Sequence, residues 1–340
     1  MQFFDYEECE QIKETNLYQS RLKEIKAWLG SNDSKSSTIA VLLDSNIYDP
    51  LSIIEKWGFQ TSNLQVNSLS IVHPEQPVPL KWLVLDISLS INEQILELLL
   101  LISIRETKEW RSGNDRYGVS VCLWSKNPHV ISKAVISSYT KLGRIDLPTD
   151  NITRFKKHYL RYWDSRVFMH LKNILSSSQY LLYRYYLMPC LYMQHNLLWE
   201  VSQDKVDTLT DDEKVIIKNN IVHGSLKISP TQKDEINTVG LINQCLVLAY
   251  KSKDELVNPD MLNNNEIIQS IREYIKISVG QGVKELKHQY IWVLLSLTVH
   301  PNFYLHQRVQ IAIKNNKLSF TEKMQTINNE DWEIIQRAGY

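Results

Sequence analysis

The sequence has 340 residues, and its 38 Lys and Arg residues balance 38 Asp and Glu residues, so the formal net charge is zero. This balance excludes a general nucleic-acid-binding protein, which needs a basic excess to neutralise phosphates. Nine Trp and seventeen Tyr beside only seven Phe indicate a folded protein with substantial contact surfaces, and the length suggests two domains.

The N-terminus and the cysteines indicate where the protein works. Residues 1–10 are acidic, whereas a secretory signal starts with basic residues and continues with an apolar stretch. The longest apolar run, Ile95–Ile104, is interrupted by Glu97 and Ser103 and is shorter than the roughly 20 residues that span a membrane. The cysteines lie far apart without paired spacing: Cys9, Cys122, Cys190 and Cys245. We therefore expect a soluble cytoplasmic protein with buried reduced thiols and no membrane partner.

The first half of the sequence alternates strand and helix patterns. Two short apolar runs that end in an acid, Ile39–Asp44 and Trp82–Asp86, predict buried strands. Between them, Pro50–Trp57 predicts a short helix, with Asp49 as its N-cap and Pro50 at its first position.

Further elements of this half follow in chain order. We expect a Leu-rich helix over Asn92–Glu109, a strand over Tyr117–Trp124, an amphipathic helix over Pro128–Leu142 and a strand over Phe155–Trp163. The last strand leads directly into a helix that Asp164 caps.

The second half is expected to be helical, because strand patterns stop at about Ser178. Three segments fit a capping box, in which the cap and the third residue satisfy each other's backbone amides: Thr210–Glu213, Ser229–Gln232 and Ser319–Glu322. Further helices are predicted over Glu266–Ser278, Val283–Val299, Phe303–Asn315 and Asp331–Arg337. The expected fold class is α+β or α/β, with an N-terminal α/β lobe (residues 1–195) containing a small, largely buried sheet, then an all-α lobe (residues 196–340).

An aromatic segment lies near the expected boundary between the lobes. It contains Tyr180, Tyr183, Tyr185, Tyr186, Tyr192 and Trp199, and Pro189 interrupts it. Aromatic residues are enriched in interface cores, so the segment is a candidate surface for partner recognition. The segment is equally a candidate for the seam where the two lobes pack.

Few residues offer a catalytic apparatus. The sequence contains neither a Gly-x-Ser-x-Gly elbow nor a glycine-rich phosphate loop, and no histidine pair has metal-ligand spacing. Asp44 and Asp86 each end a predicted strand, where they either act as a metal-binding or acid–base pair or cap the following loop. Ser125 follows a strand without flanking glycines. We expect no metal and no cofactor.

Several motifs occur in an order that resembles one known family. Val41–Asp44 is followed by Asp49-Pro50-Leu51, then by Tyr117-Gly118-Val119 and finally by Leu160–Phe168. This order is similar to that of the adaptor-chaperones of bacterial type VI secretion, the Tap or TEC proteins.

The last of these segments is similar to the family signature Arg-Phe-Tyr-Asp-Pro-Arg-Val-Leu. Four positions match it: Arg161, Asp164, Arg166 and Val167. Ser165 stands in the place of the family's Pro and Trp163 in the place of its Tyr. From the residues alone, opposite charges beside a strand-to-helix turn predict a structural ion pair between Arg161 and Asp164, with Asp164 as the helix cap.

The resemblance implies a protein without catalytic activity. Members of the family bind a toxic effector in the cytoplasm and load it onto the C-terminal region of the VgrG spike protein. The resemblance also implies that the motif residues serve either structure or partner binding: Asp44, Asp49, Pro50, Gly118, Arg161, Asp164 and Arg166. The alternative is an α/β hydrolase or nuclease-like enzyme that uses Asp44, Asp86 or Ser125.

Overall fold

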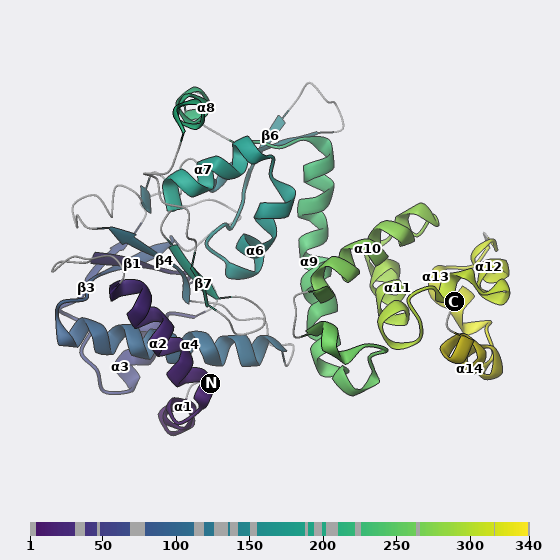
Figure 1. The fold of residues 1–340 in the computed structure, drawn as a ribbon, viewed down its shortest axis with the longest axis horizontal. Helices are drawn as coiled ribbons and strands as arrows, with labels where there is room; N and C mark the ends of the chain where they lie inside the picture. Colours follow the sequence, from purple (N-terminus) through teal and green to yellow (C-terminus); the bar gives the residue numbers. More distant parts are fainter. Residues whose placement is uncertain are drawn as a thin grey trace. The chain divides into compact units, whose positions relative to one another are not determined.

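A computed structural model of the chain (Figure 1) describes residues 5–30, 38–45, 48–68, 79–111, 119–125, 135–136, 142–149, 155–187, 190–193, 199–201, 210–221, 226–262, 266–315 and 317–338. The chain forms two compact units. Unit 1 consists of residues 1–109 and 115–236, and unit 2 consists of residues 110–114 and 237–340. The units divide later in the chain than the expected boundary at residues 195 and 196.

The main element of unit 1 is a six-stranded sheet with the order β2-β3-β1-β4-β7-β8. Its strands are β1 (Thr38–Leu43), β2 (Gln65–Ser68), β3 (Lys81–Asp86), β4 (Val119–Ser125), β7 (Cys190–Met193) and β8 (Trp199–Val201). All neighbouring strands are antiparallel. The expected strands at β1, β3 and β4 are confirmed, and their antiparallel pairing makes the fold α+β.

Both faces of the sheet are covered at β1, which explains why every residue of this strand is buried. Ala40 and Leu42 contribute to a core with α6 (Ser165–Ile174) and α7 (Ser177–Leu187). The alternate residues Ile39, Val41 and Leu43 contribute to a second core with helices on the other face. Those helices are α1 (Tyr6–Lys13), α2 (Asn16–Gly30), α3 (Pro50–Lys56) and α4 (Ser90–Arg111). Figure 1 shows the resulting three layers, which follow from the two-residue period of a strand.

A smaller sheet in unit 1 has the order β6-β5-β9. Its strands are β5 (Arg144–Pro148), β6 (Phe155–Tyr159) and β9 (Leu226–Lys227). β5 runs antiparallel to β6 and parallel to β9. The strand predicted over Phe155–Trp163 ends early because the chain turns, with the Tyr162 amide bonded to the Leu160 carbonyl at 2.8 Å.

The expectation that strands stop at Ser178 is wrong, since β7, β8 and β9 all follow it. These strands have four, three and two residues, too few for a two-residue period to be recognised. They form because β4 and β5 supply their hydrogen-bonding partners. The expected all-α lobe from residue 196 therefore begins with chain that belongs to the sheets of unit 1.

The predicted helix caps are confirmed, although α11 (Leu286–Thr298) begins at Leu286 instead of Val283 and α12 (Gln307–Ile313) begins at Gln307 after the 3-10 helix Phe303–Leu305. Asp49 accepts a hydrogen bond from the Leu51 amide at 3.1 Å, with Pro50 at the first helical position. Reciprocal capping-box bonds form at all three predicted sites, which begin α8 (Asp211–Ile221), α9 (Pro230–Lys251) and α13 (Phe320–Gln325). Gly118 and most of the helix predicted over Pro128–Leu142 lie outside the described residues.

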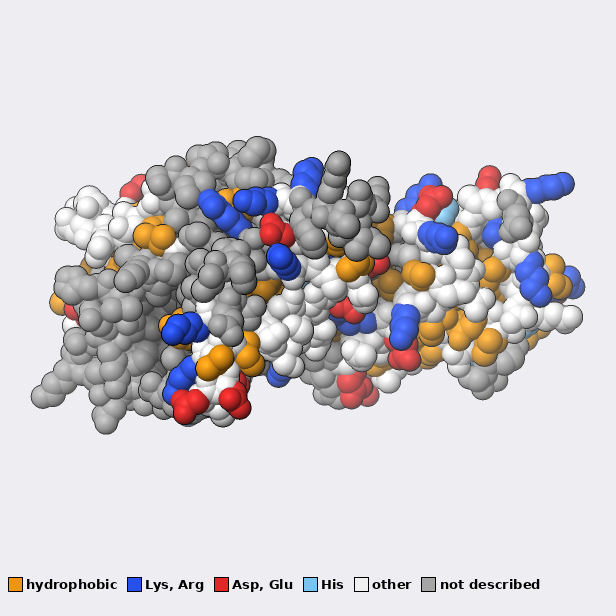
Figure 2. Space-filling view, turned by 90° about the horizontal axis from the view of Figure 1, so that it is seen from above, with side chains coloured by type: hydrophobic (Ala, Val, Ile, Leu, Met, Phe, Trp, Pro, Cys, Tyr) orange, Lys and Arg blue, Asp and Glu red, His pale blue; other side chains and the backbone are white. Residues whose placement is uncertain are grey.

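The regular elements described within unit 2 are helices. They comprise the end of α9, then α10 (Glu266–Gly280), α11 (Leu286–Thr298), α12 (Gln307–Ile313), α13 and α14 (Asn329–Ala338), with short 3-10 helices η2 (Lys253–Glu255), η3 (Pro259–Leu262) and η4 (Phe303–Leu305). The core is aromatic: the ring of Trp292 lies 5.0 Å from Phe303 and 5.6 Å from Phe320. Figure 2 also shows apolar side chains, in orange, on the surface of this unit.

Two further expectations concern the cysteines and the membrane. Cys245 is buried, and burial raises the pKa of its thiol to about 12, so this residue is a neutral thiol as expected. The side chains of Cys9, Cys122 and Cys190 lie outside the described part of the structure. Among the described residues, no helix combines the length and the apolar character that a membrane crossing requires.

Candidate functional site

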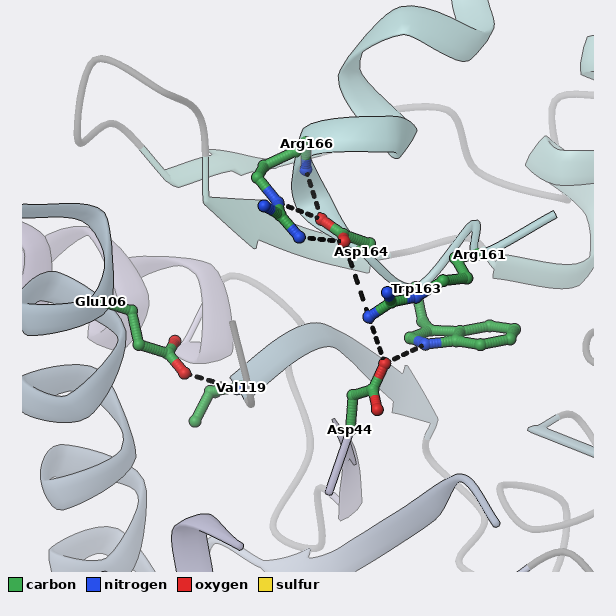
Figure 3. Close-up of polar contacts among 7 residues, drawn as sticks. All are labelled: Asp44, Glu106, Val119, Arg161, Trp163, Asp164 and Arg166. Carbon is green, nitrogen blue, oxygen red and sulfur yellow. Dashed lines mark hydrogen bonds and ion pairs between the residues drawn. The ribbon is translucent and has the colours of Figure 1, made fainter. Parts of the chain in front are cut away.

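Residues from two distant sequence motifs meet at one end of the large sheet (Figure 3). Asp44 directly follows β1, and Arg161 lies in the turn after β6. The Arg161 guanidinium donates a hydrogen bond from Nη2 to Asp44 Oδ2 at 2.6 Å. These residues lie 117 positions apart in the sequence, so the fold brings them together.

Asp44 is an internal anchor for this turn. Its side chain is 1% exposed, and its Oδ2 also accepts a hydrogen bond from Trp163 Nε1 at 3.0 Å. The Arg161 side chain is 34% exposed, so the pair reaches from the buried sheet end to the surface. A buried carboxylate requires such partners, because an unpaired charge in the interior is costly.

Asp164 continues the set of charges at the start of α6. It caps the helix by accepting a bond from the Arg166 amide at 3.0 Å. The Arg166 side chain donates two further bonds, from Nε at 3.0 Å and from Nη2 at 2.7 Å. Arg161 Nη2 lies 3.7 Å from Asp164 Oδ2. Asp44, Arg161, Asp164 and Arg166 thus form one network of alternating charge, which we call the Asp44 network.

The predicted ion pair beside the Asp164 cap is therefore confirmed, but with different main partners. Arg161 lies closer to Asp44 than to Asp164, and Asp164 bonds chiefly to Arg166. The expectation from the sequence paired Arg161 with Asp164 because they are neighbours in the chain. Asp44 could not be recognised as a partner before the fold was known.

Burial has a larger effect on these groups than their partners have. Burial raises the pKa of Asp164 to about 6, although Arg161 and the bond from the Arg166 amide favour its charged form. Burial also lowers the pKa of Arg166 to about 10, against the opposing charges of Glu106 and Asp44. Both shifts reflect the cost of removing a charge from water.

Glu106 of α4 extends the polar cluster and was not predicted. It is fully buried, its Oε1 accepts a bond from the Val119 amide at 3.2 Å, and the Tyr48 hydroxyl donates to the same oxygen. Glu106 follows the buried residues Leu98 and Ile102 by eight and four positions, which places it on the same helical stripe. The sequence signal that could have identified Glu106 as a site residue is its position as an acid on an otherwise apolar helical stripe.

The aromatic residues beside the Asp44 network belong to the core of unit 1. Tyr162 packs edge-to-face against Trp163 at 5.2 Å and against Tyr183 at 6.1 Å. Tyr183 is buried and donates a hydrogen bond to the Leu142 carbonyl at 3.1 Å. Tyr183 is therefore internal to unit 1 and does not lie on its surface. The aromatic ring of Tyr183 is used inside one unit. The same core contains Ile217, Leu226 and Ile228, which belong to the expected second lobe.

The other candidate aromatics are less completely described. Tyr180 is half-buried and packs against the same core as Tyr183. The side chains of Tyr186, Tyr192 and Trp199 lie outside the described residues. Tyr185 is exposed, at 39%. Of the described aromatic residues of this segment, Tyr185 is thus exposed, whereas Tyr180 and Tyr183 pack against the core of unit 1.

The structure separates the acids of the enzymatic alternative. In the antiparallel register, Asp86 lies opposite Thr38 at the start of β1, whereas Asp44 follows its last residue. A strand rises about 3.3 Å per residue, which puts the two acids roughly 20 Å apart. Ser125 also lies opposite Thr38, so it too is far from Asp44.

Asp86 has a local role of the kind expected for a loop cap. Its Oδ1 accepts bonds from the Ser88 amide at 3.0 Å and from the Ser88 hydroxyl at 2.7 Å. Among the described residues, no group of three or more His, Cys, Asp or Glu side chains could hold a metal ion. The acids of the site accept hydrogen bonds from arginines, from backbone amides, from the Trp163 indole and from the Tyr48 hydroxyl.

Comparisons with protein-family models, with curated proteins and with solved structures give no match for this chain.

Proposed function

We propose that this chain is a cytoplasmic adaptor-chaperone of a type VI secretion system. In this role it binds a toxin effector and the C-terminal region of VgrG, and it catalyses no reaction itself. One observation carries the proposal. The motifs that resemble the family contain Asp44 and, at least 117 positions later in the sequence, Arg161, Asp164 and Arg166. In the structure these four residues form one network.

The Asp44 network supports this role through rigidity. It ties the end of β1 to the turn before α6 and to the first residues of that helix. A preorganised surface loses less conformational entropy when a partner binds. An adaptor that must hold two protein partners benefits from such a fixed scaffold.

The chaperone activity would arise because binding to the folded effector stabilises the folded effector. A partner that binds the folded effector but not the unfolded effector stabilises it by about 2.7 kcal/mol at a concentration of 100 times Kd. A net charge of zero suits subsequent release, because no large field of one sign holds the effector.

Co-purification tests the proposal. The tagged full-length chain is produced together with the VgrG C-terminal region and with the toxin encoded beside it. We expect both proteins to be retained, and the effector's melting temperature to rise when the adaptor is added. Loss of both partners from a chain with a native circular dichroism spectrum would contradict the proposal.

The same protein preparation also tests the enzymatic alternative. If Asp86→Ala or Ser125→Ala abolished a measured hydrolytic turnover without changing the circular dichroism spectrum, the enzyme would replace the adaptor. We expect no such turnover in the parent chain. Asp44 is a poor choice for this test, because its replacement disturbs the Asp44 network.

A further inference from the structure

Strand β6 forms one edge of the small sheet in unit 1. One side of β6 pairs with β5, in a register from Arg144 opposite Tyr159 to Pro148 opposite Phe155. No described strand pairs with its other side. An edge strand presents backbone N–H and C=O groups that can pair with a strand of another chain. β6 is therefore a possible template for one more strand.

The inner side of this sheet is fixed to the core of unit 1. Ile145 and Leu147 of β5 and Leu226 of β9 are buried in the core that also contains residues of α6 and α7. Tyr159 at the end of β6 packs against the same core. An arriving strand would thus meet an ordered backbone, and the entropy cost of binding would fall mainly on the partner.

The small sheet has a basic excess in a protein whose net charge is zero. β6 has the sequence Phe-Lys-Lys-His-Tyr, and both Lys156 and Lys157 are exposed. Arg144 and Lys227 add two positive charges, whereas Asp146 is the one acid in the three strands. Figure 2 looks down on the side of unit 1 where Figure 1 labels β6, and blue Lys and Arg side chains gather there.

The two lysines make both faces of the edge basic. Consecutive residues of a strand point to opposite faces, so Lys156 and Lys157 lie on different sides of the sheet. In the register with β5, Lys156 lies opposite Leu147, whereas Lys157 lies opposite Asp146, the one acid of the three strands. Lysines on an edge discourage pairing with a second copy of that edge, because like charges would meet. They favour a strand that carries acids.

We propose that β6 binds an extended acidic segment of a partner protein, which adds a fourth strand to the small sheet. Backbone hydrogen bonds to β6 provide the pairing, and adjacent acids on the partner meet Lys156 and Lys157 on the two faces. The inference names the class of partner segment for the adaptor, and so it rests on the proposed function.

Peptide binding to the full-length chain tests this docking edge. The probe is a fluorescent peptide of Val and Thr residues interspersed with Asp-Glu pairs. One matched peptide carries Pro at alternate positions and cannot pair along its length, and a second carries Lys in place of every acid. Fluorescence anisotropy should detect binding of the acidic peptide and of neither matched peptide.

Charge reversal on β6 supplies the decisive variant. The double variant Lys156→Glu and Lys157→Glu should reduce the affinity for the acidic peptide by at least about tenfold, because like charges then face each other. The same variant should bind the Lys peptide. Lys156→Gln with Lys157→Gln serves if the reversed chain fails to fold, and a smaller loss is expected. The control is Lys23→Glu with Lys56→Glu, two exposed lysines of α2 and α3, which should change nothing.

Three results would overturn the docking edge. The first is that the acidic peptide does not bind the parent chain. The second is that the Pro peptide binds as tightly as the acidic peptide. The third is that the control variant loses as much affinity for the acidic peptide as the charge-reversed variant does. The assay contains no secretion protein, so its failure beside successful co-purification would overturn the docking edge alone. Peptide binding beside failed co-purification would overturn the adaptor function alone.

Discussion

The two units bury different kinds of side chain. Unit 1 buries Asp44, Glu106 and Asp164 among its apolar residues. The described part of unit 2 buries no Asp, Glu, Lys or Arg, and its core is formed around Trp292, Phe303 and other apolar residues. Both units therefore depend on apolar packing, and unit 1 adds buried charged groups to its apolar cores.

The difference has a physical lesson. A buried ion pair adds little net stability, because desolvation offsets the attraction, but it penalises any arrangement that leaves one partner alone. We infer that the Asp44 network selects the geometry of the turn before α6. Apolar packing in unit 2 supplies stability in proportion to buried area, with less directional preference.

The largest expected effect is in the aromatic core of unit 2. Trp292→Ala removes a fully buried ring and should destabilise unit 2 by about 4 kcal/mol through lost burial and the resulting cavity. Hydrogen exchange should accelerate in α10, α11 and α13, while α4 and α6 keep their protection. Leu286→Ala on α11 is the control, since that side chain is 53% exposed. Equal acceleration in both units would contradict independent cores.

The next effect concerns the charged core of unit 1. Asp44→Asn keeps the volume and one acceptor oxygen but removes the negative charge that faces the Arg161 guanidinium, and should cost about 3 kcal/mol. Urea denaturation, read through exchange of α6 amides, measures it. Asp49→Asn is the matched control: it retains a capping side chain and loses a half-exposed pair with Lys81, so under about 1 kcal/mol is expected. Similar costs for both variants would show that burial of the Asp44 network is unimportant.

The pKa of Asp164 predicts a pH dependence with a definite sign. The folded state raises this pKa from 3.8 to about 6, which means that the folded chain binds the proton of Asp164 more tightly than the unfolded chain does. The protonated carboxyl group therefore stabilises the fold fully below pH 3.8, and this stabilisation is lost as the pH rises to 6. The shift corresponds to at most about 3 kcal/mol.

Asp164→Asn provides the reference for this measurement, because Asn also caps helices. The unfolding free energy of the parent minus that of the variant should fall between pH 4 and pH 6 and should then remain level. A difference that increases over this interval would mean that Arg161 and Arg166 hold the carboxyl pKa below 3.8.

The smallest effect should come from a surface cap. Ser319 accepts a bond from the Glu322 amide at 3.4 Å at the start of α13. Ser319→Ala should cost about 1 kcal/mol, whereas Ser319→Asn should be almost neutral. Thermal denaturation compares the two variants. A cost for Ser319→Ala as large as that of Trp292→Ala would show that the cap stabilises more than its own helix.

Features that depend on neighbouring residues could be predicted from the sequence. The caps at Asp49, Asp164 and Ser319 involve partners within three positions. The strands β1 and β3 were identifiable because each is a short, wholly apolar run bounded by an acid. The α+β composition followed from these local patterns, since apolar period and capping residues are properties of short segments.

Features that depend on distant partners required the tertiary structure. Antiparallel pairing of β1 with β3 separated Asp44 from Asp86, and the same fold gave Asp44 its partner Arg161. Strands β7, β8 and β9 exist only through pairing, and Tyr183 is internal only because α7 covers the sheet. The sequence by itself thus determined the capped helix starts, the strands β1, β3 and β4, and the fold class. The structure decided which charges meet, because pairing and burial join segments that no local pattern connects.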